Sequence, residues 1–306
     1  MNLLITGAAK FNTNQTDALA NLGFEIKFQS DEAGTPQTDF SCIDAVICNN
    51  LFLFHELDEF ESLKFIQLTS AGLDRVPVDK INGKKIPLCN ARGVYSVPIA
   101  EFVLGSILNL YKGYNDFYEN KKLKVWEKNR NVRELNGSCA TIIGCGSIGC
   151  ECAARLKAFG VKTIAVDILK PNAVYFDEYY DISEVKKAVS TSDIVIFCLP
   201  LNAKTQGLAD IEFFKACKDS ATIVNISRGA IINEDDLISA LRERYIGYAI
   251  LDVFEKEPLS ADSPLWEMEN VTLTPHNSFV SEKNQERFFK LAYNNLKSFI
   301  KRGNEK

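Results

Sequence analysis

Three ionisable residues in the carboxyl-terminal half of the chain stand in positions suited to acid–base chemistry. Arg228, Glu257 and His276 each follow an apolar, β-branched run that predicts a β-strand. Because open α/β sheets bind ligands where their strands end, we expect these side chains to meet at one edge of one sheet. A fixed cation, a carboxylate and a titratable imidazole at that edge are suited to proton transfer on an anionic substrate. His276 is also one of only two histidines in the chain.

Each of the three residues also has a purely structural interpretation. Arg228 can be a surface arginine at a strand end, Glu257 a loop carboxylate, and His276 a turn residue whose ring is satisfied by its neighbours. The occurrence of all three together, each in its own recognisable run, favours a site. The other histidine, His55, is interpreted as structural or exposed.

A glycine-rich hexapeptide in the middle of the chain predicts a dinucleotide site. It follows a predicted strand, opens a predicted helix, and reads Gly144-Cys145-Gly146-Ser147-Ile148-Gly149. In such a turn the first glycine makes the bend, the second admits a pyrophosphate to the backbone, and the third allows close helix–strand packing. The helix amino terminus adds N–H donors and partial positive charge. Such turns also close ordinary strand–helix connections. The acidic residue that the fingerprint needs is supplied by Asp167, at the end of the next predicted strand.

Asp167 also indicates which cofactor is bound. A carboxylate there accepts hydrogen bonds from the ribose hydroxyls and repels a 2′-phosphate. The residues that follow, Ile168-Leu169-Lys170, offer no arginine to hold a phosphate, although Lys170 is a cation. We therefore predict NAD in preference to NADP.

Composition excludes several classes of function. The net charge of −5 and the isoelectric point near 5.3 give no basic footprint for nucleic acid or an anionic membrane. No apolar run reaches the ~18 residues that a membrane span needs, and the amino terminus lacks a basic signal segment. The nine cysteines are odd in number and mostly fall in or beside apolar runs, which fits reduced thiols in the cytoplasm. Cys145, Cys150 and Cys152 have no partner ligands nearby in sequence, so we predict no metal site.

The order of predicted elements indicates two α/β domains in a chain of 306 residues. Strands are expected at residues 3–6, 25–28, 45–49, 65–69 and 86–89, with helices at 14–22 and 57–63 between them. A second series begins near residue 138, with strands at 139–143, 162–166, 194–199, 221–226, 249–253 and 271–274 and a helix at 148–159. The last segment, 281–300, is a helix too long for a connector, so we expect it to return to the first domain. The expected domains are residues 1–96 with 281–306, and residues 97–280.

A long helix is predicted between the two series, at residues 98–119, with Pro98 in its first turn. Its apolar positions can serve either a domain core or a partner subunit, and the sequence does not divide them between these roles. They are Phe102, Val103, Ile107, Leu110 and Tyr114.

Together these motifs resemble the D-isomer-specific 2-hydroxyacid dehydrogenases. The resemblance rests on the glycine fingerprint and on residues 225–229, 251–258 and 274–276, and it extends over about residues 65 to 280. It implies two Rossmann-like, doubly wound parallel-sheet domains with an active-site cleft between them. It also implies interconversion of a 2-oxo acid and a D-2-hydroxy acid by hydride transfer, with NAD as cofactor, and a homodimer joined through the predicted 98–119 helix.

The resemblance also implies roles for single residues. Arg228 resembles the arginine that binds the substrate carboxylate and carbonyl, His276 the general acid/base, and Glu257 the carboxylate that orients and charges it. Asp252 resembles the aspartate near the nicotinamide carboxamide. The cofactor-lining turn matches Leu199 and Pro200, and the turn whose backbone N–H groups hold the substrate carboxylate matches Ser70, Ala71 and Gly72.

The substrate side departs from the family pattern. The run Asn277-Ser278-Phe279 follows His276 where the family more often has small residues, and Phe279 can crowd the site or pack a hinge. Arg92 and Tyr95, in the loop that resembles the domain junction, identify no substrate. A second hypothesis from another class is an NAD-sensing regulatory protein of the corepressor type, which shares the fold and can retain the catalytic trio. Turnover of NADH with a panel of 2-oxo acids separates the two.

Overall fold

The computed structural model describes residues 1–171 and 174–304, and the chain divides into two compact units. The first unit comprises residues 1–95 and 281–306, and the second comprises residues 96–280. Each unit contains one wholly parallel sheet, of five strands in the first and seven in the second. This confirms the predicted α/β class with two Rossmann-like parallel sheets.

The sheet of the first unit has the strand order β2-β1-β3-β4-β5. Its strands are β1 (Asn2–Thr6), β2 (Glu25–Gln29), β3 (Ala45–Cys48), β4 (Phe65–Leu68) and β5 (Leu88–Cys89). Successive side chains of a strand point to opposite faces, so each face has its own core. Leu3 and Ile5 pack with α1 (Thr13–Ala20) and the last helix, whereas Leu4 packs with α2 (Leu51–Phe54) and α3 (Val78–Gly83).

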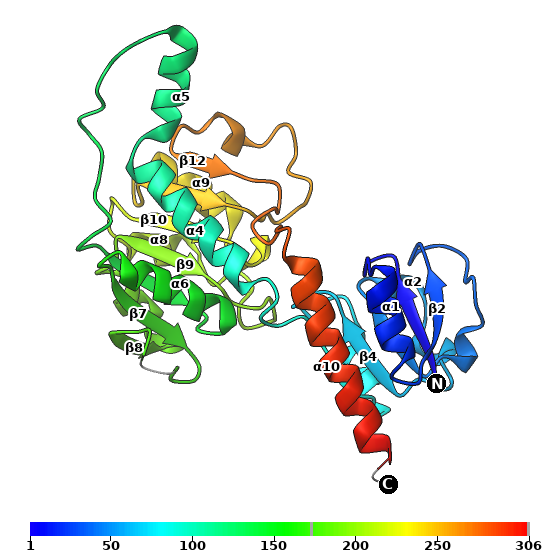
Figure 1. Ribbon diagram of the computed structural model, residues 1–306. Coiled ribbons are helices and arrows are strands. Elements are labelled where there is room, and N and C mark those ends of the chain that lie inside the picture. The colour runs from blue at the N-terminus through cyan, green and yellow to red at the C-terminus, as the bar shows by residue number, and fades with distance from the viewer. Residues whose placement is uncertain (172–173, 305–306) are drawn as a thin grey trace. The chain divides into compact units, whose positions relative to one another are not determined.

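The last helix, α10 (Asn284–Asn304), belongs to the first unit (Figure 1). It buries Phe288, Ala292 and Leu296 in the same core as Leu3. The Nδ2 of Asn295 donates to Oε1 of the buried Gln67 on β4 at 2.8 Å. This polar contact fixes the helix on a strand more than two hundred residues earlier in the chain.

The sheet of the second unit has the order β12-β11-β10-β9-β6-β7-β8. Its strands are β6 (Cys139–Ile143), β7 (Lys162–Asp167), β8 (Glu178–Asp181), β9 (Ile194–Phe197), β10 (Thr222–Asn225), β11 (Tyr248–Leu251) and β12 (Val271–Leu273). The helices that follow its strands are α6 (Ser147–Ala158), α7 (Val185–Val189), α8 (Ile211–Lys215) and α9 (Glu234–Arg242). The near-continuous Val and Ile of β9 and β10 are fully buried, as expected for a parallel sheet covered on both faces.

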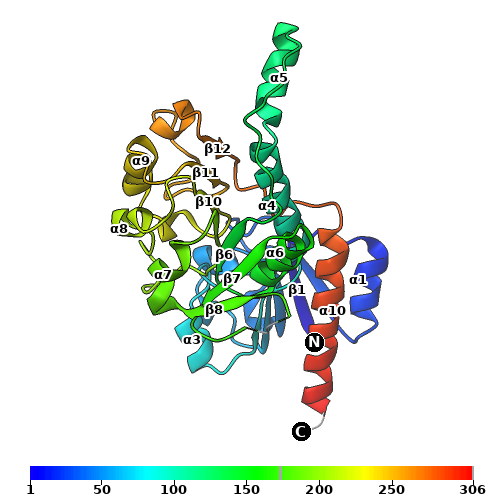
Figure 2. The same ribbon diagram turned by 90° about the vertical axis from the view of Figure 1, so that its left-hand side faces the viewer.

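The long helix predicted at residues 98–119 is wrong as a single element. The structure has α4 (Ser96–Tyr111) and α5 (Tyr114–Leu123), separated at Gly113, whose φ is +64°. A left-handed residue cannot continue a right-handed helix, so the chain turns there. Figures 1 and 2 show α5 extending from the end of α4, away from the seven-stranded sheet.

Two further expectations need correction. The predicted helix at residues 57–63 is only a short 3₁₀ segment, η2 (Leu57–Glu59). Strand β8 was not predicted, because Glu178-Tyr179-Tyr180-Asp181 is polar and lies at the edge of the sheet, where an apolar run is not required.

Candidate active site

The three ionisable residues singled out in the sequence each follow one of three neighbouring parallel strands. Arg228 follows β10, Glu257 follows β11 and His276 follows β12, and these strands pair in the order β12-β11-β10. The expectation that all three leave one edge of one sheet is therefore confirmed.

His276 and Glu257 form a hydrogen-bonded pair. The imidazole Nδ1 lies 2.8 Å from Oε2 of Glu257, and the two side chains are 31% and 37% exposed. The other carboxylate oxygen, Oε1, accepts the N–H of Phe254 at 3.2 Å. With Nδ1 occupied by the carboxylate, Nε2 is the ring atom available to a substrate. This is the arrangement of an acid/base group held in place by a carboxylate.

Asp252 holds the turn on which His276 sits. It is fully buried, and its two carboxylate oxygens accept the hydroxyl of Thr274 at 2.6 Å and the N–H groups of Asn277 and Ser278 at 2.8 and 2.9 Å. The turn needs this support because His276 has a φ of +51°, a left-handed conformation that is unfavourable for a residue with a Cβ. The cofactor contact expected for Asp252 stays a proposal.

The loop of Arg228 is ordered by Asn225, the last residue of β10. Its Oδ1 accepts the N–H and hydroxyl of Ser227, and its Nδ2 donates to the carbonyl oxygen of Arg228. Gly229 then packs against the loop after β11, since a Cβ there would lie 1.8 Å from the carbonyl carbon of Phe254. Only glycine permits this approach, which brings the loop of Arg228 against the loop that carries Glu257.

The glycine-rich turn between β6 and α6 fits a dinucleotide pyrophosphate. Gly144 has a φ of +96°, and a Cβ on it would strike the backbone of Cys198. A Cβ on Gly149 would lie 2.2 Å from the carbonyl oxygen of Gly144, so helix and turn are in close contact. A Cβ on Gly146 would have no heavy atom within 4 Å, which leaves open space at the amino terminus of α6. The three glycines thus meet the three requirements of the fingerprint.

Asp167 ends β7 beside this turn. Its carboxylate accepts the N–H of Cys145 at 2.6 Å and that of Ile168 at 2.7 Å. Burial, with a smaller contribution from Asp167, raises the pKa of the Cys145 thiol to about 12, so this thiol stays neutral. Leu199 and Pro200 follow β9, whose backbone Gly144 approaches, and are half-buried and exposed.

The turn expected to hold the substrate carboxylate, Ser70, Ala71 and Gly72, follows β4 in the first unit. Tyr95 donates its hydroxyl to the carbonyl oxygen of Thr69 at 2.5 Å, and Asn90 donates its Nδ2 to that of Ala71 at 2.7 Å. Across the residues that the structure describes, the N–H groups of 71–73 find no acceptor. Consecutive unbonded N–H groups can bind an anion where the backbone curves around it. Sequence reasoning missed Asn90 and Tyr95 as supports, because nothing in their types marks them.

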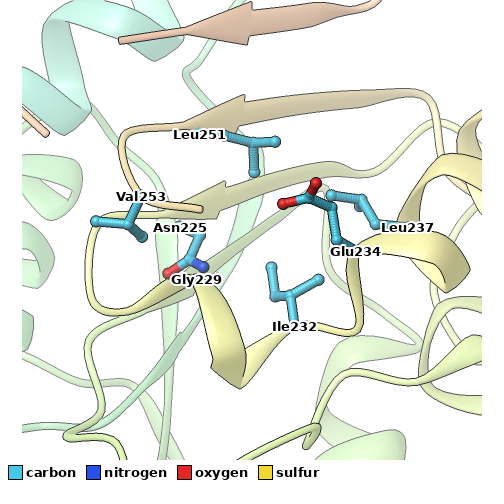
Figure 3. A pocket seen from close by; sticks show the side chains of 7 residues that line it. All are labelled: Asn225, Gly229, Ile232, Glu234, Leu237, Leu251 and Val253. Carbon is cyan, nitrogen blue, oxygen red and sulfur yellow. The ribbon is translucent and has the colours of Figure 1, made fainter. Parts of the chain in front are cut away.

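A small pocket lies beneath the loop of Arg228, between β10, β11 and α9 (Figure 3). The carboxyl group of Glu234 lies among Ile232, Leu237 and Leu251. Burial raises the pKa of Glu234, and the nearby Glu255 carboxylate raises it further, whereas the N–H of Glu255 acts in the opposite direction. None of the three ionisable residues lines this pocket. We therefore assign the pocket to the structure that supports their loops.

Other kinds of site were sought over the described residues, 1–171 and 174–304. They include no group of three or more His, Cys, Asp and Glu side chains able to hold a metal ion. None of their helices is long and apolar enough to cross a membrane. All nine cysteines are free thiols.

The chain matches a family model and several known proteins. Residues 104–278 match the family model described as "D-isomer specific 2-hydroxyacid dehydrogenase, NAD binding domain". The chain is 31% identical over 258 residues to the glyoxylate reductase of Thermofilum pendens, covering 80% of this chain and 74% of that one. It is 30% identical over 251 residues to the hydroxypyruvate reductase of Blautia hydrogenotrophica, with 78% and 76% covered.

The fold has close relatives among solved structures. A D-isomer specific 2-hydroxyacid dehydrogenase family protein from Aeromonas salmonicida aligns with a TM-score of 0.83 at 29% identity. The alignment covers 98% of this chain and 95% of that one, so it includes both units.

Proposed function

This chain belongs to the D-isomer specific 2-hydroxyacid dehydrogenase family of oxidoreductases, and we propose that it interconverts a 2-oxo acid and a D-2-hydroxy acid with NAD as cofactor. The observation that carries the proposal is the His276–Glu257 pair at the sheet edge that Arg228 also occupies. Reduction of a ketone needs a hydride at carbon and a proton at oxygen. A positioned imidazolium supplies the proton, which contributes roughly 10²–10⁴-fold to the rate.

In the proposed mechanism His276 gives the proton on Nε2 to the substrate carbonyl oxygen during reduction and takes it back during oxidation. Glu257 holds the imidazolium through Nδ1, so the ring keeps its orientation while its charge changes. Arg228 binds the substrate carboxylate and polarises the carbonyl, because a guanidinium offers two parallel N–H donors to a planar anion. We further propose that the turn of Ser70, Ala71 and Gly72 binds a substrate carboxylate through backbone N–H groups.

The nicotinamide cofactor supplies and accepts the hydride when bound. The proposed contacts are Gly144, Gly146, Ser147, Ile148 and Gly149 around the pyrophosphate, Asp167 at the ribose, and Leu199, Pro200 and Asp252 along the rest of the cofactor. The open space at Gly146 supports this assignment.

We propose NAD rather than NADP because the carboxylate of Asp167, at the end of the strand after the glycine-rich turn, would repel a 2′-phosphate. Two backbone N–H groups already hold its carboxylate at the end of β7, so it cannot turn away from the ribose without losing them. Fluorescence titration should give tighter binding of NADH than of NADPH, and Asp167→Ala should narrow the difference. Tighter NADPH binding by the unchanged protein would contradict the assignment.

We also propose a cytoplasmic homodimer in which α4 and α5 contact a second copy. Val103 and Ile107 of α4 are buried within the unit, whereas α5 buries no residue. Exposed apolar side chains continue from α5 into the following segment, where Trp126 is fully exposed. Such a surface supports an interface rather than a solvated arm. Sedimentation at micromolar concentration should give a dimer, and a mass near 34 kDa would exclude it. The nine free thiols support a reducing compartment.

A panel of 2-oxo acids with NADH tests the proposed function. Steady oxidation of NADH with at least one acid, and formation of the D isomer, is the expected result. Tight NADH binding without turnover of any acid would favour the NAD-sensing regulatory protein instead.

A further inference from the structure

Strand β8, which the sequence did not predict, ends in a second carboxylate at the carboxyl edge of the seven-stranded sheet. β8 pairs in parallel with β7 at the end of the sheet (Figure 1). Asp181, the last residue of β8, is in register with Asp167, the last residue of β7. Paired strands lie about 4.8 Å apart, and partners in register point to the same face of the sheet. Two carboxylates are therefore neighbours at the edge where the ribose of a dinucleotide is expected.

The side chain of Tyr179 joins the ends of these two strands. Its hydroxyl donates to the carbonyl oxygen of Asp167 at 3.2 Å. Burial raises the pKa of the Tyr179 hydroxyl, and the carboxylates of Asp181 and Asp167 raise it further, so the hydroxyl stays protonated and keeps this bond. Tyr179 and Asp181 are two residues apart on one strand and share a face of the sheet. The contact agrees with the register, because it reaches Asp167 from the strand that carries Asp181.

Asp181 is charged and has no cationic partner. Its Oδ1 accepts the hydroxyl of Ser183 at 2.7 Å and the N–H of the same residue at 3.0 Å. These two hydrogen bonds lower the pKa of Asp181, so the carboxyl group is ionised at neutral pH. Among the residues that the structure describes, neither Asp181 nor Asp167 forms a salt bridge.

Other carboxylates of the same region are neutralised by lysines. Glu178, at the start of β8, lies 2.6 Å from the ammonium group of Lys162, and Glu184 lies 3.4 Å from that of Lys187. A paired carboxylate contributes little to the potential beyond the strand ends. The unpaired carboxylates of β7 and β8 determine this potential, and the segment after β7 sets one exposed cation, Lys170, against the two of them.

We propose that Asp181 is a second determinant of cofactor choice, which acts with Asp167 to exclude the 2′-phosphate of NADP from this edge. In dinucleotide folds an acidic residue in the position of Asp167 binds the ribose 2′-hydroxyl. A phosphate on that oxygen would bring a charge of about −1.5 to −2. Asp167 repels it directly, and Asp181 repels it from the neighbouring strand. This inference rests on the proposed NAD specificity and extends it to a residue outside the glycine fingerprint.

Coulomb repulsion sets the size of the expected effect. A unit charge about 7 Å from a phosphate dianion, with water between them, changes the Kd about 3- to 10-fold. Removal of one carboxylate leaves the other in place, so neither single variant should abolish the preference for NAD. Asp167→Ala combined with Asp181→Asn should narrow it further than either change alone.

Fluorescence titrations of NADH and NADPH with Asp181→Asn test the inference. Asparagine keeps the oxygen that accepts both hydrogen bonds from Ser183 and removes only the charge. The Kd of NADPH should fall about 3- to 10-fold, while that of NADH changes less than about twofold. Asp181→Glu keeps the charge and should leave both Kd values close to those of the unchanged protein. The matched control is Asp219→Asn, which removes an exposed carboxylate before β10, at the opposite edge of the same sheet, and should change neither Kd.

Salt separates the charge of Asp181 from a direct contact. The Debye length is about 10 Å at 0.1 M salt and about 3 Å at 1 M. The tighter NADPH binding by Asp181→Asn should therefore shrink to less than about twofold in 1 M NaCl. A gain that persists in full at 1 M would show that Asp181 acts through contact and contradict the proposal.

The titrations also distinguish this inference from the proposal on which it rests. An unchanged Kd of NADPH in Asp181→Asn, or equal changes for both cofactors, would overturn the role of Asp181 and leave the NAD specificity to Asp167. Tighter binding of NADPH than of NADH by the unchanged protein would overturn the proposed NAD specificity, and this inference with it.

Discussion

The two parallel sheets carry different kinds of proposed binding group at their carboxyl edges. In the second unit the groups are side chains, Arg228, Glu257 and His276, whose supports come from residues 225–278. In the first unit the groups are mainly backbone N–H donors at residues 71–73, held by contacts from distant parts of the chain. Proton chemistry needs particular side chains, whereas a carboxylate can be bound by any backbone in the right conformation.

This difference predicts how each unit responds to substitution. A side-chain change in the second unit removes the chemical group itself. A side-chain change in the first unit leaves the N–H donors in place and only loosens them. We therefore expect kcat effects from the second unit and KM effects from the first.

The largest effect is expected from His276→Ala. The variant loses the proton donor, so turnover should fall by roughly 10²–10⁴-fold, while NADH binding stays nearly intact because the imidazole acts on substrate. Single-turnover rates and a fluorescence titration of NADH measure the two quantities. Retention of more than about a tenth of the turnover would mean that another group supplies the proton.

Asp252→Ala should come next, and it should affect both stability and rate. It leaves the buried N–H groups of Asn277 and Ser278 without acceptors and releases the strained backbone of His276. We expect a loss of about 2–5 kcal/mol in the free energy of unfolding, measured by urea denaturation. Asp252→Asn keeps one acceptor oxygen and should lose less. A stable alanine variant with unchanged kcat would assign Asp252 to the cofactor alone.

Glu257→Gln tests the pair more finely. Glutamine keeps the shape and one hydrogen bond but removes the charge that stabilises the imidazolium. The kcat of reduction should therefore fall by roughly 10-fold or more, while the KM of the oxo acid changes little. Steady-state kinetics measures both once chemistry is shown to limit the rate. An unchanged kcat would remove Glu257 from the mechanism.

In the second unit the sequence indicated the candidate chemical groups but not the residues that support them. These groups could be recognised because each is an ionisable residue in the segment that follows an apolar strand. They are Arg228, Glu257 and His276. The role of the buried Asp252 in holding the turn of His276 could not be predicted. Its hydrogen bonds reach residues some twenty-five positions later, and such contacts leave no local sequence pattern. Gly113 is the residue at which α4 and α5 separate. A single glycine within a helical pattern of apolar residues does not show whether the helix bends or ends there, so the break was not predicted.

In the first unit the candidate binding groups themselves were predicted only from the resemblance to the family and not from the residues. Residues 70–72 carry no distinctive side chain, and their supports, Asn90 and Tyr95, lie in a separate loop. The contact of Arg75 with Asn50 joins the ends of two strands that pair only in the folded sheet. Such contacts depend on tertiary register, which one sequence does not reveal.

Tyr95→Phe probes the first unit directly. It removes the hydroxyl that donates to the carbonyl oxygen of Thr69 but keeps the ring in the core. Loss of one such bond, about 0.5–1.5 kcal/mol, corresponds to an increase of roughly 2- to 10-fold in the KM of the oxo acid with kcat nearly constant. Steady-state kinetics at saturating NADH measures both. A fall in kcat at constant KM would contradict the division between the two units.

Glu234→Gln should have the smallest effect, and it separates a supporting carboxylate of the second unit from the catalytic ones. Burial and the Glu255 and Asp235 carboxylates raise the pKa of Glu234 in the folded protein. A raised carboxyl pKa means that its stabilising contribution is present below the unfolded value, about 4.3, and is lost as pH rises through the folded value. Glutamine stays neutral at every pH and resembles the protonated form. The variant should therefore have a higher Tm than the unchanged protein at pH 7, with the difference shrinking toward pH 4. An equal Tm difference at both values would show that the hydrogen bond from the N–H of Glu255, and not charge, determines the effect.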